Sequence, residues 1–76
     1  MTNELSKEEA ELREELLRHL MKGPDQCEHI ISTTKNPSAD VRSVLQHMLI
    51  AGDIKADQLM DDVVLTDQSQ ITLVDK

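Results

Sequence analysis

The longest stretch of regular apolar spacing lies in the middle of the chain. Its aliphatic side chains recur every three or four positions, as on one face of a helix; they are Val41, Val44, Leu45, Met48 and Leu49. Gly52 follows where this pattern stops, and glycine suits a left-handed helix end. The pattern predicts a helix over about residues 37–51, which is capped by Asn36 or, alternatively, by Ser38.

A second helix signal lies near the N-terminus. Its apolar positions form an i, i+4 row with two neighbours, namely Leu12, Leu16 and Leu20 with Leu17 and Met21 beside them. Ser6 and Glu9 have the spacing of a capping box, and Gly23 followed by Pro24 ends the pattern. We expect a helix over about residues 7–22. Its wide apolar stripe either packs inside the monomer or forms part of a dimer contact.

A shorter helix is expected between these two. Asp25 and Glu28 have the spacing of an N-cap signal, and Cys27, Ile30 and Ile31 form a short apolar face. The polar run that follows favours a turn. The sequence therefore predicts a helix over about residues 25–33.

After Gly52 the apolar pattern becomes that of extended segments. Three runs are typical of strands: Ile54–Ala56, Val63–Thr66 and Ile71–Val74. The second run can pair with the first or with the third, and a three-stranded meander satisfies both pairings. The sequence leaves these hairpins open within a β region of about residues 54–74.

The composition narrows the class of protein. Seventy-six residues allow a single domain, 1–76, and the absence of Phe, Tyr and Trp leaves aliphatic side chains to build its core. The same absence removes the aromatic platforms on which single-stranded nucleic acids stack. A lone cysteine, no apolar run of membrane-spanning length and no signal peptide predict a cytoplasmic protein.

The order of the predicted elements is informative in itself. A helix, a short helix, a turn and a helix are followed by glycine and by an aliphatic residue that opens a hairpin. This order resembles the winged helix-turn-helix superfamily, and the residues that carry the resemblance are Val41–Ile54 and Val63–Asp67. The resemblance spans about residues 7–67. It implies an α+β fold, namely a three-helix winged helix-turn-helix with a small C-terminal antiparallel β-hairpin or three-stranded sheet.

The winged-helix resemblance also implies a function for the third helix. Arg42 and Gln46 lie one turn apart and are expected to reach base edges in the major groove of double-stranded DNA, with Ser43 beside them. Ser38 is expected to contact a base or a phosphate, and Lys35 a phosphate. The implied function is a small DNA-binding transcriptional regulator, which forms a homodimer through its first helix.

The distribution of charge favours a different partner. The chain has a net charge of −7. Residues 16–55 carry five bases and four acids, whereas residues 56–76 carry five acids and one base. A hairpin that contains Asp57, Asp61 and Asp62 would repel a phosphate backbone. The alternative hypothesis is therefore an acidic winged-helix module for protein–protein interaction, or a DNA mimic, that binds a basic protein through these three aspartates.

Catalytic and metal chemistry are not expected from the sequence. Cys27 and His29, with His19 and His47, match no standard zinc spacing, and Cys27 reads more simply as a small core residue. Cys27 and His29 fall on different sides of one helix, and two glycines cannot form a phosphate-binding loop. We expect no enzymatic activity, no cofactor and no metal.

Overall fold

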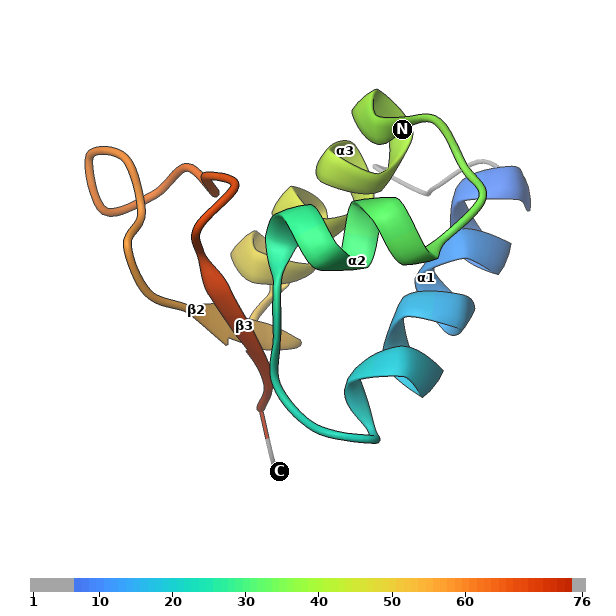
Figure 1. The fold of residues 1–76 in the computed structure, drawn as a ribbon, viewed down its shortest axis with the longest axis horizontal. Coiled ribbons are helices and arrows are strands. Elements are labelled where there is room, and N and C mark those ends of the chain that lie inside the picture. Colours follow the sequence, from blue (N-terminus) through green and yellow to red (C-terminus); the bar gives the residue numbers. More distant parts are fainter. Residues whose placement is uncertain (1–6, 75–76) are drawn as a thin grey trace.

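The computed structural model describes residues 7–74. Within that range the fold is α+β, with three helices and a small three-stranded antiparallel sheet. Figure 1 shows the helices grouped on one side of the sheet, with the long segment between the last two strands (orange) at the left of the view. The elements are α1 (Lys7–Leu20), β1 (Asp25–Gln26), α2 (Cys27–Thr33), α3 (Ser38–Ala51), β2 (Ile54–Ala56) and β3 (Gln70–Leu73).

Helix α1 is slightly shorter than the sequence predicts. It ends at Leu20, and residues 21–22 form a turn in which the N–H of Gly23 donates to the carbonyl of Leu20 over 3.0 Å. Gly23 has a φ of +143°, which glycine adopts without strain. The helix therefore ends two residues earlier than predicted, and Gly23 follows the turn and does not cap the helix directly. The capping box predicted at Ser6 lies outside the described residues. Arg13 of α1 binds Asp53 beyond α3 (Nη2 to Oδ2, 2.7 Å) and ties the two helices together.

The start of α2 differs from the prediction. Asp25 and Gln26 do not open the helix, because they form β1 and pair with β3. The helix begins at Cys27, whose N–H donates to the carbonyl of Ser69 over 2.9 Å. The first turn of α2 is therefore bonded to a distant part of the chain, which the local N-cap signal could not reveal.

Helix α3 ends as predicted but begins differently. Pro37 occupies the cap position, so neither Asn36 nor Ser38 is the N-cap. The carbonyl of Pro37 accepts the N–H groups of Asp40 and Val41. At the other end Gly52 adopts φ +86°, and its N–H donates to the carbonyl of Leu49 over 3.2 Å.

The sheet has the strand order β1-β3-β2, and this overturns both predicted hairpins and the meander. Strand β2 pairs directly with β3, with Ile54 opposite Leu73 and Ala56 opposite Ile71. In the described chain, residues 63–66 form no strand, and pairing there is limited to an isolated bridge between Met60 and Val64. Residues 57–69 are thus one long connection, called the β2–β3 loop below.

The core is aliphatic, as the composition predicts. It joins one face of each helix to the sheet and to one residue of the β2–β3 loop. Its buried members are Leu12, Leu16, Leu20, Cys27, Ile30, Val41, Val44, Leu45, Met48, Ile54, Leu65 and Ile71. The leucine row of α1 lies inside this core, whereas Met21 is exposed. Of the five apolar residues predicted on α3, Leu49 is only half-buried.

Among residues 7–74, none of the helices is long and apolar enough to cross a bilayer.

We predict that Leu45→Ala lowers the free energy of unfolding by about 2–5 kcal/mol, because Leu45 is completely buried and the change leaves a cavity. Ile50→Ala on the same helix is the matched control, since the Ile50 side chain is 79% exposed. It should change stability by less than about 0.5 kcal/mol. Urea denaturation followed by circular dichroism measures both values, and equal losses would contradict the placement of the core.

Candidate functional site

The polar face of α3 is turned toward the β2–β3 loop. Gln46 donates from Nε2 to the carbonyl of Val63 over 2.6 Å, and its Oε1 accepts the N–H of Leu65 over 3.1 Å. One turn earlier, Arg42 forms an ion pair with Asp67. The two side chains that the sequence assigns to base edges of DNA therefore bind the protein's own loop.

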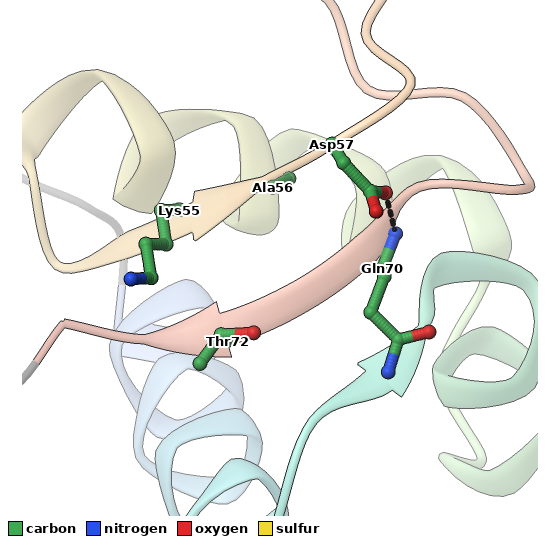
Figure 2. Close-up of a pocket in the computed structure, with 5 residues that line it drawn as sticks. All are labelled: Lys55, Ala56, Asp57, Gln70 and Thr72. Atoms are coloured by element: carbon green, nitrogen blue, oxygen red, sulfur yellow. Dashed lines mark hydrogen bonds between the residues drawn. The ribbon is translucent and has the colours of Figure 1, made fainter.

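The base of the β2–β3 loop is fixed by a second set of hydrogen bonds. Ser69 is fully buried, and its Oγ accepts the N–H of Thr66 over 2.9 Å. The hydroxyl of Thr66 donates to the carbonyl of Gln58 over 3.1 Å. Across the loop entrance, the N–H of Gln70 donates to Oδ1 of Asp57 over 2.7 Å (Figure 2). The loop is consequently anchored at both ends, and its middle is presented to solvent.

The middle of the loop, residues 60–64, forms its tip. Met60 and Val64 close the tip through two backbone hydrogen bonds, of 2.7 and 3.0 Å. Asp61 and Asp62 lie between them with φ values of 53° and 66°, a conformation that aspartate tolerates better than most residues. Both aspartates are exposed, and so are the apolar side chains of the tip: Met60 by 55%, Val63 by 59% and Val64 by 40%.

The remaining predicted DNA contacts lie at other places on the surface. Lys35 precedes α3, Ser38 is its first residue, and Ser43 lies on its outer side; all three are exposed. Lys35 and Ser38 thus mark the N-terminal end of α3, while Arg42 and Gln46 lie further along, against the loop. The structure separates the five residues into an exposed set of three and an internally bonded set of two.

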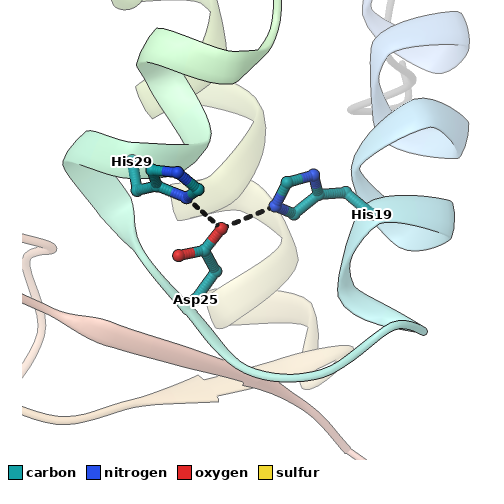
Figure 3. A group of neighbouring side chains, drawn as sticks. All are labelled: His19, Asp25 and His29. Carbon is teal, nitrogen blue, oxygen red and sulfur yellow. Dashed lines mark hydrogen bonds and ion pairs between the residues drawn. The ribbon is translucent and has the colours of Figure 1, made fainter.

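Sequence reasoning missed a cluster at the junction of α1, β1 and α2. Oδ2 of Asp25 lies 2.7 Å from Nε2 of His19 and 2.6 Å from Nδ1 of His29. Figure 3 shows the three side chains pointing toward one another. The only local signal was the four-residue spacing of Asp25 and His29; the approach of His19 requires the folded chain. The expectation of no metal rested on Cys27 and the three histidines and did not consider Asp25.

Burial and hydrogen bonding have opposite effects on the pKa of the Asp25 carboxyl. Partial burial alone would raise its pKa, but hydrogen bonds from His19, His29 and the N–H of Gln26 outweigh burial, so the pKa is lowered from 3.8. An ionised Asp25 therefore stabilises the fold above pH 3.8. This contribution is lost as the pH falls through the lowered pKa of the folded state.

Cys27 is a core residue, as the sequence predicts. It is fully buried, and burial raises the pKa of its thiol; Asp67 also raises that pKa, whereas Arg42 lowers it. A buried thiol with a raised pKa remains protonated near neutral pH and is a poor nucleophile.

A shallow depression on the outer face of the sheet has a volume of about 220 Å³. It is lined by side chains of β2, β3 and the loop entrance, namely Lys55, Ala56, Asp57, Gln70 and Thr72 (Figure 2). The depression is open to solvent, and its one carboxylate already accepts the N–H of Gln70. It therefore lacks the enclosure and the converging polar groups of a typical small-molecule site.

Comparisons with protein-family models, curated proteins and solved structures found no match to the chain. The function proposed below therefore rests on the geometry of the chain itself.

A double-mutant cycle tests the bond between Arg42 and Asp67. Their side chains are 43% and 46% exposed, so we predict a coupling energy of up to about 1 kcal/mol at low ionic strength, which decreases as salt is added. Arg42→Ala, Asp67→Ala and the double variant are compared by urea denaturation. Ser43→Ala combined with Asp67→Ala is the control pair and should be additive. A coupling of zero for Arg42 and Asp67 at low salt would contradict the ion pair.

Proposed function

We propose that the protein is a small interaction module of winged-helix type, and that it binds a basic protein surface through the tip of its β2–β3 loop. The observation that carries this proposal is the engagement of Arg42 and Gln46 with that loop. The polar residues of α3 position the loop, and the loop tip presents the side chains available to a partner.

The order of the elements supports the winged-helix part of the proposal. Helix α3 ends at Gly52 and is followed at once by β2, which pairs with β3 across a long loop. A hairpin directly after the third helix is one of the features on which the resemblance rests; Val63–Asp67, which was expected to close the hairpin, lies in its loop. The β2–β3 loop then corresponds to the wing.

The chemistry of the loop tip supports a basic partner. Asp61 and Asp62 carry two negative charges beside the exposed side chains of Met60, Val63 and Val64. Protein interfaces commonly combine an apolar centre with charged groups at the rim, and complementary charge raises the association rate. A partner that fits this tip has an apolar spot surrounded by Lys or Arg.

DNA binding through Arg42 and Gln46 would require these internal bonds to break. Each hydrogen bond lost costs about 1 kcal/mol, and the N–H of Leu65 would lose its acceptor. The loop tip would also bring two carboxylates toward the phosphates, which weakens rather than strengthens association. These costs make DNA the second candidate.

One observation still favours DNA as that second candidate. Lys35 lies just before α3, and Ser38 and Ser43 lie in its N-terminal half; all three are exposed where a helix can contact phosphate. Such a regulator would use this end of α3 and not the residues that bind the loop. Dimerisation through α1 belongs to this second candidate and is a separate proposal.

A pair of NMR titrations distinguishes the two candidates. The ¹⁵N-labelled protein is titrated with a synthetic peptide of alternating lysine and leucine and, separately, with a mixed-sequence DNA duplex of about 20 base pairs, which covers two major-groove turns. We predict that the peptide shifts the amides of the loop tip, residues 60–64, that added salt reverses these shifts, and that DNA leaves the amides of residues 35–47 unchanged. Salt-sensitive shifts on residues 35–47 with DNA would support the regulator instead.

Matched variants distinguish the contribution of the loop tip to binding from that of the overall negative charge. Asp61→Asn with Asp62→Asn removes two charges from the tip, and asparagine tolerates the same positive φ. Glu8→Gln with Glu11→Gln removes two exposed charges from α1. The tip variant should bind the peptide several-fold more weakly, and more weakly than the α1 variant, because complementary charge at the contact raises association. Equal losses would mean that net charge alone attracts the peptide.

A further inference from the structure

We propose that His19, Asp25 and His29 bind one divalent transition-metal ion of the zinc class. The three donor atoms are Nε2, Oδ2 and Nδ1, and all lie within 4.8 Å of one another. Two imidazoles and a carboxylate form a donor set that binds zinc in proteins. The same set is a poor match for calcium or magnesium, which prefer oxygen ligands.

The distances from the Asp25 carboxylate to the two imidazoles are close to those that a metal requires. Bonds of about 2.0–2.2 Å in a tetrahedron place neighbouring ligand atoms about 3.4 Å apart. The two nitrogens lie 2.7 and 2.6 Å from Oδ2 of Asp25. Each of these two contacts therefore has to lengthen by less than about 1 Å. The two nitrogens, which lie within 4.8 Å of each other, have to take up the same spacing.

The backbone around the cluster is held in place by bonds that do not depend on a metal. Asp25 belongs to β1 and is paired with Ile71 of β3. Its other carboxylate oxygen, Oδ1, accepts the N–H of Gln26 over 2.8 Å, which leaves Oδ2 directed at both histidines. His19 comes from the last turn of α1 and His29 from α2 (Figure 3). Hydrogen bonds that orient a ligating carboxylate are typical of metal sites.

The cluster also has an open side. The His19 and Asp25 side chains are 20% and 22% exposed, whereas that of His29 is 62% exposed. Beside His29 is an open depression of about 400 Å³, lined by Asp25, Gln26, Glu28, His29 and Ser32. A water molecule can complete the tetrahedron from this side, so three protein ligands suffice.

A metal at this position would join three segments of a protein that has a small core. It would connect the end of α1 to β1 and α2, and binding to the folded chain alone raises its stability. The proposal is independent of the loop tip, because none of its ligands lies in the β2–β3 loop.

Calorimetric titration of the untagged, chelator-treated protein with zinc chloride tests the site. We expect one zinc ion per chain and a higher melting temperature in the presence of zinc. His29→Gln is the main variant, because this exposed side chain can be replaced without disturbing the core. It should weaken zinc binding at least about tenfold. Loss of a residue that only hydrogen-bonds to a metal ligand typically costs about 10–100-fold in affinity, and loss of a ligand itself should cost no less. Asp25→Asn should weaken binding in the same direction.

His47→Gln is the matched control, because His47 lies on α3 outside the cluster. It should keep the zinc affinity of the unaltered protein. The proposal is overturned if zinc does not bind, if His29→Gln leaves its affinity unchanged, or if His47→Gln weakens binding as much as His29→Gln does. In the first case the three side chains form a hydrogen-bonded cluster only.

Discussion

The side chain of Gln46 donates one hydrogen bond to the β2–β3 loop and accepts another from it, and these two bonds hold the loop against α3. The arrangement of the C-terminal third depends on them. They occupy the carbonyl of Val63 and the N–H of Leu65, which a neighbouring strand would otherwise need. With its backbone bonded in this way, the loop places the Leu65 side chain in the core. Residues 63–66 therefore form an anchored loop and not the strand that their β-branched composition favours.

The same hydrogen bonds of Gln46 determine which surface is available to a partner. A chain without aromatic residues has a limited core, so polar contacts from α3 and from the buried Ser69 contribute to holding the long loop. Arg42 and Gln46 are consequently internal partners. Beyond them the loop tip carries two aspartates among exposed apolar side chains, which is the combination that the proposed basic partner recognises. The combination of two carboxylates with exposed apolar side chains, and not acidity alone, distinguishes this surface.

The sequence predicted those features that depend on neighbouring residues. Leu12, Leu16 and Leu20 marked the buried face of α1, and Gly52 marked the end of α3, because helical spacing and a positive φ leave local signatures. The pairing of β2 with β3 could not be read in the same way, since Gln46 determines the path of the intervening loop from a distant helix. The role of Asp25 could not be predicted from neighbouring residues either. Its spacing to Glu28 suggested a helix N-cap, but pairing with Ile71 places it in a strand. The approach of His19 to Asp25 likewise required the fold.

Hydrogen exchange at the N–H of Leu65 tests the central claim most directly, because this group donates to Gln46. The account predicts that it is protected in the unaltered protein. In Gln46→Ala its protection should fall to nearly that of an unstructured peptide, while the amides of α1 keep most of theirs. Rapid exchange of Leu65 in the unaltered protein, or protection that survives Gln46→Ala, would contradict the claim that Gln46 holds the loop.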